Sequence, residues 1–430
     1  MKRNALRRAV AVAASVGIAA ALTACSSGGS PAQEDGPVTL TYWTWAPGVA
    51  QVVDTWNAQH PEIQVKVEQP PEQTTSWPRC WPRSGAGEGP DIFAAEYQKV
   101  PNLVLSGAGY DISSMIGDAK ADFTDSTWSL VTVGDGVYAV PQDTGPMVFM
   151  YRADIFAQHG WQVPTTFDEY AALAAQVRTT LPNTYLGGFP DEGATLAAYS
   201  MQAGAQWWST EGDAWKVDID GAPTRQVLDF WEPLVRKDLI STTHFFTPEW
   251  NTALNDGTLL SWMVGVWGPG SIASVAPDTA GDWRIAKMPA WRSGETATGL
   301  FGGSSAMVGA TTKHAKQAVE FLTWLNGSKE GSSLLAEGGL FPASVAGQES
   351  LPSLEVPKLA TGQSDFWQVA SQAASDAVPF TWGPNVQFAF DSYSDSIKKA
   401  LTGGTPWTDV LTSTQDAVIG DLKNTGFTVQ

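Results

Sequence analysis

The N-terminal part of the folded chain has a clear pattern of apolar and polar positions. The segment VTLTYWTW (38–45) alternates apolar with polar side chains, which is the two-residue period of a half-buried β-strand. The next segment, VAQVVDTWNAQHPE (49–62), places its apolar residues at helical spacing, and IQVKVEQ (63–69) alternates again. A strand, a helix and a second strand in this order predict a parallel βαβ unit.

In later segments, strand and helix patterns continue to alternate along the chain. VYAVPQD (137–143) and MVFMY (147–151) predict two buried strands near the edge of the first domain. PTTFDEYAALAAQVR (164–178) predicts a helix that a capping box of Thr166 and Glu169 opens. Two more amphipathic helices are predicted at TRQVLDFWEPLVRK (224–237) and at 313–326, the latter closed by Gly327. The fold class is therefore α/β, with two lobes.

The first residues carry the pattern of a secretory leader. A basic stretch with four Lys and Arg residues precedes a short apolar run at 9–22, and Leu22-Thr23-Ala24-Cys25 follows. This ending resembles a lipobox, which implies that residues 1–24 are removed and that Cys25 carries a lipid. Residues 25–37 are rich in Ser, Gly and Pro, which predicts a flexible tether. A plain signal peptide with an incidental cysteine is the alternative.

The net charge and the number of cysteines exclude some functions for this chain. Removing the four positive charges of the leader takes the net charge of the 430-residue chain from -19 to -23. So acidic a chain without a basic run is not expected to bind nucleic acid. Once Cys25 is lipidated, only Cys80 remains, which excludes an internal disulfide and is too little for a metal site.

Several blocks, in order, resemble a known family. They are LTYWTW (40–45), GEGPDIFAAEYQ (87–98), GVYAVPQDTGPMVFMYRADIFAQHGWQVPTTFDEY (136–170), GTLLSWMVGVWGPGSI (257–272) and GLFGGSSAMVGATTKHAKQAVEFLTWLN (299–326). The chain resembles the carbohydrate-binding extracellular solute-binding proteins of ABC importers, the group that includes maltose-binding protein. The resemblance begins at about Val38 and reaches the C-terminus.

The resemblance implies the two-lobed, type II fold of periplasmic binding proteins, with a ligand cleft between lobes that close by a hinge motion. Lobe one is expected to comprise residues 38–143 and 303–343. Lobe two is expected to comprise residues 144–302 and 344–430.

Aromatic side chains are the first candidates for the ligand site, because their flat faces stack on the C–H faces of sugars. The chain has 20 tryptophans, more than core packing is expected to require. Trp267 in GVWGPG matches the position of a ligand-stacking tryptophan in the family. Trp45 lies just beyond the first strand at the expected cleft edge, and Trp382 in FTWGPN matches a late segment that lines the cleft. Ordinary packing is the alternative for each.

Polar side chains and two glycines complete the predicted site. Gln98 falls where relatives place a hydroxyl-binding side chain, and Asp143 lies at the predicted crossover between lobes. Asp191 and Glu192 in GFPDEG match a cleft loop of lobe two. Gly302 and Gly303 would let the backbone approach the ligand. Surface groups or caps are the alternative for the four polar side chains, and a simple turn is the alternative for the glycines.

An enzyme is the main alternative to a binding protein. A secreted, tryptophan-rich glycoside hydrolase would need two carboxylates at a defined separation in space. The four histidines are scattered without a metal-binding spacing, and GGSSAM lacks the closing glycine of a nucleophile elbow. We expect no enzyme, no metal and no cofactor. A receptor for another solute, such as a peptide, is the further alternative, since oligopeptide receptors share the two-lobed plan.

The resemblance therefore predicts an extracytoplasmic, monomeric receptor that binds a sugar or short oligosaccharide. Its partners would be the transmembrane permease subunits of the importer. It would contact the membrane, at the outer face of the cytoplasmic membrane, only through the lipid on Cys25.

One segment, SWPRCWPRSG (76–85), departs from the family, which has an amphipathic helix at this place. Pro78 and Pro82 exclude a regular helix here. A binding loop, a repositioned helix or an insertion would each explain the segment. With permissible codons, Arg-Cys-Trp-Pro-Arg-Ser is also a shifted-frame reading of an apolar peptide that contains Met-Leu-Ala-Ala-Leu. We therefore hypothesise a short frame-shifted segment at 77–84, which carries no redox or metal chemistry.

Overall fold

The computed structural model describes residues 37–46, 48–69, 89–212 and 214–430. The leader, Cys25, the tether and the segment SWPRCWPRSG lie outside the described residues. Within the described ranges, no helix is both long enough and apolar enough to cross a bilayer.

A seven-stranded sheet runs through the described chain in the order β10-β6-β11-β3-β1-β2, with β9 also paired to β6. Its strands are β1 (Val38–Trp43), β2 (Ile63–Glu68), β3 (Ile92–Glu96), β6 (Ala139–Arg152), β9 (Ser261–Gly265), β10 (Trp283–Lys287) and β11 (Leu300–Val308). β1 pairs with β2 and with β3 in parallel, so the predicted βαβ unit is confirmed. Two small hairpins, β4 (Thr132–Val133) with β5 (Gly136–Val137) and β7 (Trp208–Glu211) with β8 (Ala214–Val217), lie outside this sheet.

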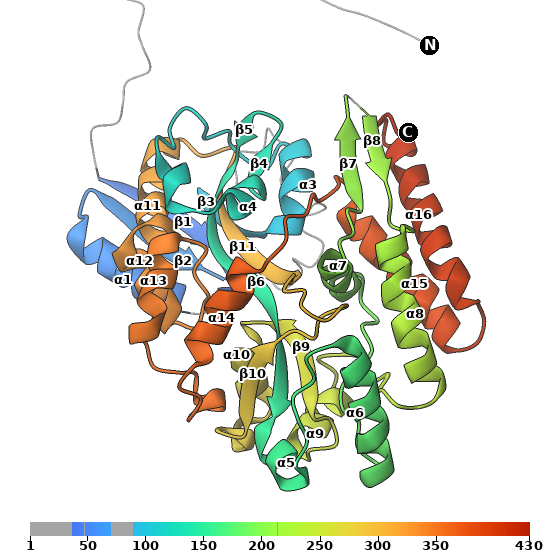
Figure 1. The fold of residues 1–430 in the computed structure, drawn as a ribbon. Coiled ribbons are helices and arrows are strands. Elements are labelled where there is room, and N and C mark those ends of the chain that lie inside the picture. The colour runs from blue at the N-terminus through green and yellow to red at the C-terminus, as the bar shows by residue number, and fades with distance from the viewer. Residues whose placement is uncertain (1–36, 47, 70–88, 213) are drawn as a thin grey trace, which may run out of the picture. The chain divides into compact units, whose positions relative to one another are not determined.

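The prediction of two separate strands at 137–143 and 147–151 is wrong, because residues 139–143 and 147–151 belong to the single strand β6, while Val137 ends β5. β6 pairs with β11 near its start and with β9 and β10 near its end (Figure 1). Its two prolines, Pro141 and Pro146, lie beside shifts in the register with β11, where a missing N–H is tolerated. Between them, the N–H of Thr144 bonds to the carbonyl of Phe341 at 2.9 Å, so the strand continues with a different partner.

The predicted helices form as α1 (Val49–Gln59), α6 (Phe167–Thr180), α8 (Ala222–Arg236) and α11 (Ala315–Gly327). Every apolar residue predicted to face inward from α1 and α6 is buried. The Thr166 side chain accepts the N–H of Glu169 at 3.2 Å, as the capping box predicts. The Glu169 carboxylate accepts the N–H of Thr165 at 2.7 Å instead of that of Thr166, so the reciprocal bond is displaced by one residue.

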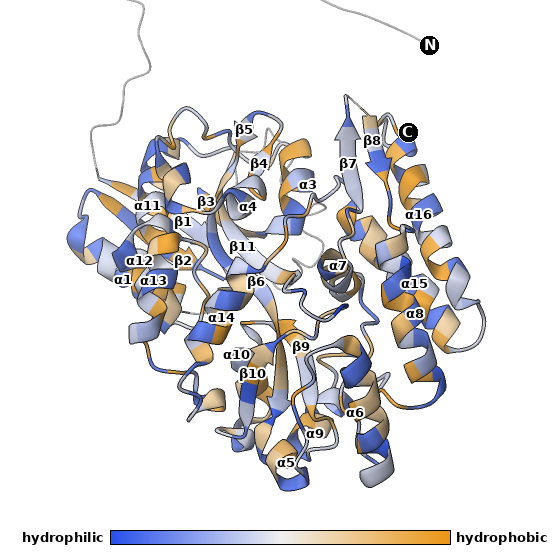
Figure 2. Cartoon of the chain, in the orientation of Figure 1, coloured by the Kyte–Doolittle hydropathy of each residue, from blue (hydrophilic) through white to orange (hydrophobic). Residues whose placement is uncertain are grey.

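The remaining helices complete the two halves of the structure. They are α3 (Val100–Leu105), α4 (Asp125–Ser129), α5 (Ala153–His159), α7 (Gly193–Gln202), α9 (Pro248–Asn255), α10 (Gly268–Val275), α12 (Lys329–Glu337), α13 (Val345–Ser350), α14 (Phe366–Ser375), α15 (Val386–Leu401) and α16 (Trp407–Asn424). Hydrophilic and hydrophobic residues alternate around α8, α15 and α16 (Figure 2), which is the pattern of helices with one buried face.

The buried apolar residues form two clusters. One contains the inner residues of β1, β2, β3, α1 and α11, and the other those of α6, α7, α8, β9, β10 and α14 to α16. β6 passes from the first cluster to the second between Val140 and Met147, and β11 passes back between Phe301 and Ala306. The lobe boundaries, 38–143 with 303–343 and 144–302 with 344–430, stay a prediction.

The second cluster is unusually rich in tryptophan. Of the 18 tryptophans among the described residues, ten are buried in the two cores, among them Trp207, Trp231 and Trp283. Core packing therefore uses more than half of the described tryptophans, and the high tryptophan count by itself does not indicate a sugar site.

Candidate ligand-binding site

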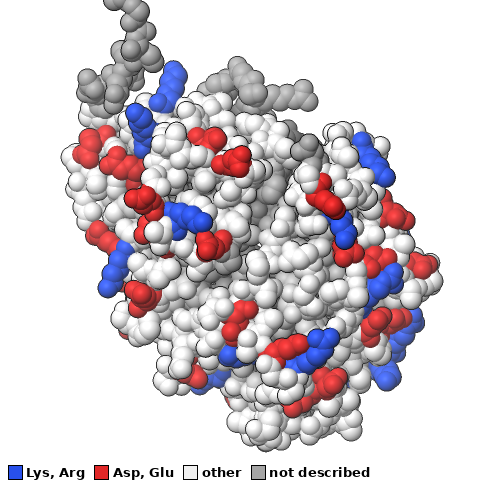
Figure 3. Space-filling model, turned by 45° about the horizontal axis from the view of Figure 1, so that its top comes forward, with Lys and Arg blue, Asp and Glu red and all other residues white. Residues whose placement is uncertain are grey.

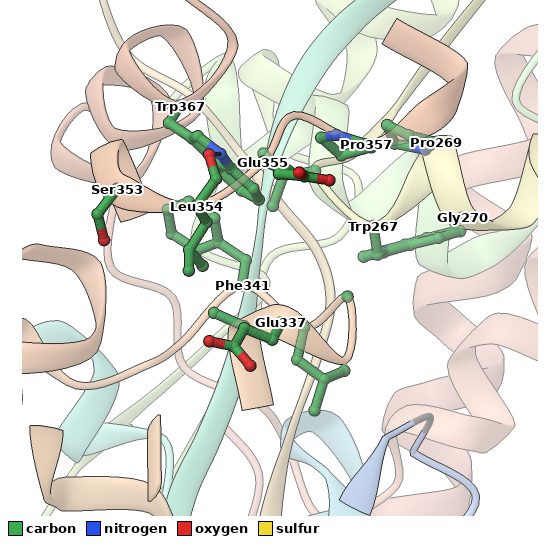
Figure 4. Close-up of a pocket in the computed structure, with 14 residues that line it drawn as sticks. Trp267, Pro269, Gly270, Glu337, Phe341, Ser353, Leu354, Glu355, Pro357 and Trp367 are labelled. Atoms are coloured by element: carbon green, nitrogen blue, oxygen red, sulfur yellow. Dashed lines mark hydrogen bonds between the residues drawn. The ribbon is translucent and has the colours of Figure 1, made fainter. Parts of the chain in front are cut away.

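A cavity of about 480 Å³ lies where α10, the end of α12 and the segment before α14 meet. Trp267 forms one side, and Leu354 and Trp367 lie on the opposite side (Figure 4). The carboxylates of Glu337 and Glu355 also line it, whereas no Lys or Arg of the described part of the chain does. The cavity therefore offers apolar and aromatic surface together with hydrogen-bond acceptors, a combination that suits small-molecule binding.

Trp267 is the predicted residue that lines this cavity, and its ring is held from two sides. It follows β9 and precedes α10, and its indole N–H donates to the carbonyl of Phe301 at 2.7 Å. The rings of Trp262 and Phe301 lie 5.5 and 5.4 Å from it, centre to centre. A tryptophan fixed in this way presents a pre-organised flat surface to a ligand.

Gly302 and Gly303 lie where β11 shifts its register against β6, and both have left-handed backbones with φ of +81° and +95°. A Cβ on Gly302 would lie 3.0 Å from the indole nitrogen of Trp267, and one on Gly303 would lie 3.0 Å from the ring of Tyr97. Close packing and positive φ therefore explain why both residues are glycine. The predicted approach of a ligand to this backbone stays a prediction.

Asp143 is buried beside these glycines, on β6. The hydroxyl of Ser304 donates to its carboxylate, and its carbonyl accepts the hydroxyl of Tyr97 at 3.0 Å. Burial raises the pKa of Asp143 to about 6, against the opposing effect of the hydrogen bonds from Ser304. Asp143 thus ties β6 to β11 at the point where both strands pass between the two cores.

Asp191 and Glu192 precede α7 and meet an imidazole that the sequence did not indicate. Nδ1 of His244 lies 2.7 Å from Oδ2 of Asp191, and Nε2 lies 3.4 Å from Oε1 of Glu192. Burial raises the pKa of Glu192, and the charge of Asp191 adds to this effect, whereas His244 and Lys398 oppose it. The three side chains form a polar cluster that is only partly exposed.

The last three predicted residues lie on different segments. Trp45, beyond the end of β1, is 42% exposed, and Gln98 is half-buried in the short helix Tyr97–Lys99. Trp382 is also half-buried, packs against both hydrophobic clusters and has the ring of Phe380 at 4.8 Å. The amide of Asn102 donates to the carbonyl of Pro384 at 3.1 Å, so α3 contacts the segment that carries Trp382.

The structure therefore brings six of the nine predicted ligand residues together in small groups, whereas Trp45, Gln98 and Trp382 lie apart. Trp267 lines the cavity with Gly302 beside it, Asp143 and Gly303 meet at Tyr97, and Asp191 and Glu192 meet at His244. The loop after Trp45 approaches the loop after α12, because a Cβ on Gly48 would lie 2.7 Å from the Cα of Gly338.

Other residues of the site were not predicted from the sequence. Phe341, Leu354 and Trp367 line the cavity, but each lies in a segment whose pattern resembles ordinary core. His244 is 53 residues from Asp191, and no local spacing predicts their contact. A second hollow of about 800 Å³ lies along α11, and no predicted site residue lines it.

Comparisons with known proteins show to which protein family the chain belongs. The family model described as bacterial extracellular solute-binding protein matches residues 42–331, and the chain belongs to this family. A lactose-binding protein of Rhizobium radiobacter is 24% identical over 424 residues, which cover 94% of this chain and 98% of the relative.

Two solved structures extend the similarity to the whole fold. One is the ABC transporter associated binding protein of Bifidobacterium animalis subsp. lactis Bl-04 in complex with β-1,6-galactobiose, with 26% identity, a TM-score of 0.79, and 92% of this chain and 100% of that chain covered. The other is the galacto-N-biose-/lacto-N-biose I-binding protein of Bifidobacterium longum, with 26% identity, a TM-score of 0.80 and coverage of 93% and 100%. The predicted two-lobed α/β fold is thereby confirmed.

Proposed function

We propose that this chain is the extracytoplasmic receptor of an ABC importer, and that it binds a sugar or a short oligosaccharide for delivery to the membrane permease. The observation that carries the proposal is the similarity over more than nine-tenths of the chain to two receptors solved with disaccharide-type ligands. The family match over residues 42–331 supports the same class.

The arrangement of the cores supports binding by closure of two lobes. β6 and β11 cross between the two hydrophobic clusters, and the chain crosses a third time before α14. We assign residues 38–143 and 303–343 to lobe one and residues 144–302 and 344–430 to lobe two. A ligand held between them would stabilise the closed form, which the permease then meets.

The chemistry of the site favours a neutral sugar. Trp267 offers a ring face, Glu337 and Glu355 offer hydroxyl acceptors, and the cavity lining contains no Lys or Arg to hold an anion. On the face drawn in Figure 3, acidic and basic side chains are interspersed, and the basic ones are scattered rather than gathered in one large patch. We also assign ligand contacts to Trp45, Gln98, Asp143, Glu192, Gly302, Gly303 and Trp382.

The proposal includes no reaction and no cofactor. The relatives are binding proteins of ABC transporters, and binding with closure accounts for the site without covalent chemistry. We further propose that the leader is cleaved before Cys25, that the lipid on Cys25 anchors a monomer to the outer face of the cytoplasmic membrane, and that the permease subunits are its protein partners.

Calorimetric titration of the purified protein with lactose, β-1,6-galactobiose and lacto-N-biose tests the proposal, with a thermal-shift screen of a wider sugar library beside it. Saturable binding of at least one sugar, without its cleavage, is expected. Absence of binding to every carbohydrate, together with binding of peptides or hydrolysis of a glycan, would overturn it.

A further inference from the structure

The contact between Asp191 and His244 joins a buried group to an exposed one. The side chain of Asp191 is 8% exposed and that of His244 is 45% exposed, with Nδ1 and Oδ2 2.7 Å apart. A carboxylate in this position accepts the N–H of Nδ1 and fixes both the orientation of the ring and its tautomer.

The second oxygen of Asp191 does not reach the surface. Oδ1 is buried and has no hydrogen-bond partner among the described residues. The hydroxyl of Tyr393 on α15, whose pKa is raised by burial and to a lesser extent by the charge of Asp191, donates to the carbonyl of Pro190 instead, at 3.0 Å. The Asp191 side chain therefore depends on His244 for its hydrogen bond, and it does not present an acceptor to a ligand in this conformation.

The outer edge of the imidazole faces a second carboxylate. Nε2 of His244 lies 3.4 Å from Oε1 of Glu192, which is longer than a strong hydrogen bond between charged groups, and the Glu192 side chain is 30% exposed. With the N–H of Nδ1 directed to Asp191, Nε2 and the Glu192 carboxylate are two neighbouring acceptors. Two adjacent hydroxyls of a sugar ring supply two donors of this kind.

The loop that carries His244 is strained and firmly anchored. Phe246, two residues later, has a φ of +63°, which is unfavourable for a side chain with a Cβ. The N–H of Ser241 bonds to the carbonyl of Gly187 at 3.0 Å, and the side chain of Thr247 caps α9. Such strain persists where the surroundings fix the backbone, and it is common at binding sites.

The same loop connects the polar cluster with the aromatic wall. The ring of Phe246 is 5.6 Å from that of Trp262, and Trp262 is 5.5 Å from Trp267. Phe246 is 52% exposed although it makes these contacts. The row of rings therefore joins Phe246, two residues after His244 in the same loop, to Trp267 through Trp262.

We propose that His244 is a ligand-binding residue of this receptor, in which Nε2 and the Glu192 carboxylate accept hydrogen bonds from adjacent hydroxyls of the bound sugar. Asp191 is the positioning residue that holds the ring from behind. The proposal rests on the sugar-binding function proposed above. It changes the role predicted for Asp191 from a direct contact to an indirect one.

The test compares His244→Ala, Asp191→Asn and the double variant with the control His159→Ala, whose histidine lies at the end of α5. The probe is whichever of lactose, β-1,6-galactobiose and lacto-N-biose the unaltered protein binds most tightly in calorimetry. His244→Ala is expected to weaken binding about tenfold or more, and Asp191→Asn less. The double variant should bind as His244→Ala does, and His159→Ala should bind as the unaltered protein does.

Two readouts separate a direct role from a structural one. Sugar affinity should fall in His244→Ala, whereas thermal unfolding without sugar, which reports any loss of folding, should stay the same as in the unaltered protein. Should His244→Ala not fold, His244→Gln and the shift of the His244 imidazole resonances on sugar addition decide the matter. Those resonances are assigned by single substitution among only four histidines.

Unchanged affinity in a folded His244 variant, or sugar addition that leaves the His244 resonances in place, would overturn the inference alone. Failure of the unaltered protein to bind any sugar would overturn the proposed function, and the inference would fall with it.

Discussion

The indole N–H of Trp267 donates to the carbonyl of Phe301 at 2.7 Å, which ties the start of α10 to the start of β11. One hydrogen bond and two ring contacts fix a tryptophan that lines the cavity. A ring held in place loses little freedom when a ligand stacks on it, so most of the contact energy is retained as affinity.

Removal of this ring should weaken sugar binding. Trp267→Ala is expected to cost about 1.5–3 kcal/mol of binding free energy, because it deletes a large aromatic contact. Trp267→Phe keeps a ring but loses the bond to Phe301, and should cost less. Calorimetry with the tightest-binding sugar measures both. Trp324→Ala, on α11 away from the cavity, is the control, and an equal loss of affinity in this control would contradict the assignment.

Gly303 should not tolerate a side chain. A Cβ there would meet the ring of Tyr97 at 3.0 Å in a backbone with a φ of +95°. Gly303→Ala is therefore expected to lower the free energy of unfolding by about 1–3 kcal/mol in denaturant titrations. Gly420→Ala lies in α16 with open space around it and without a positive φ, and should instead gain about 0.5–1 kcal/mol. The same sign for both substitutions would refute the packing argument.

Asp143 should make stability depend on pH. Burial raises its pKa in the folded protein to about 6, above the value of about 3.9 for an unfolded aspartate. Its contribution to stability is thus fully present below about pH 4 and is lost as the pH rises through about 6. The unfolding free energy of the protein, relative to that of Asp143→Asn, should fall by as much as about 3 kcal/mol between pH 4 and 7. If the difference in unfolding free energy between the protein and Asp143→Asn does not change with pH, Asp143 is solvated and the argument from burial is wrong.

The capping of α6 provides a test of local structure. Thr166→Ala removes the side-chain acceptor of the Glu169 N–H, and should lower the free energy of unfolding by about 1 kcal/mol. Thr179→Ala, near the other end of α6, removes only a bond to the helix's own carbonyl of Ala175 and is the matched control. Chemical denaturation of the two variants should separate them, and a loss confined to Thr179→Ala would be inconsistent with the cap.

Local periodicity correctly predicted the helices and strands that bury one face and expose the other. The four inward residues of α1 are buried as the spacing predicts, and β1 and β2 pair in the predicted parallel sense. β6 was divided incorrectly at Thr144-Gly145-Pro146, a sequence typical of a turn, because the shift in register with β11 and the alternative partner Phe341 are not visible in the sequence. Which N–H groups a strand can spare depends on neighbours far away in sequence.

The candidate site was predicted only where sequence marks a local feature. Trp267 was found because an apolar strand and Gly-Pro-Gly surround it, and it lines the cavity. His244 was missed, because its partner Asp191 precedes it by 53 residues. The high number of tryptophans was a poor indicator of a sugar site. Composition does not distinguish a tryptophan buried in the core, such as Trp207, from a half-buried one, such as Trp382.

The passage of β6 and β11 through both hydrophobic clusters also has a mechanical consequence. Two paired strands resist twisting, so a rotation of one half against the other must be absorbed where their ladder is interrupted. These places are the register shifts at Leu300/Gly303 and Ser304/Ser305. Under the closure of two lobes proposed above, we expect the torsional stiffness of this short stretch to influence how fast the receptor opens, and with it the rate at which a captured molecule is released.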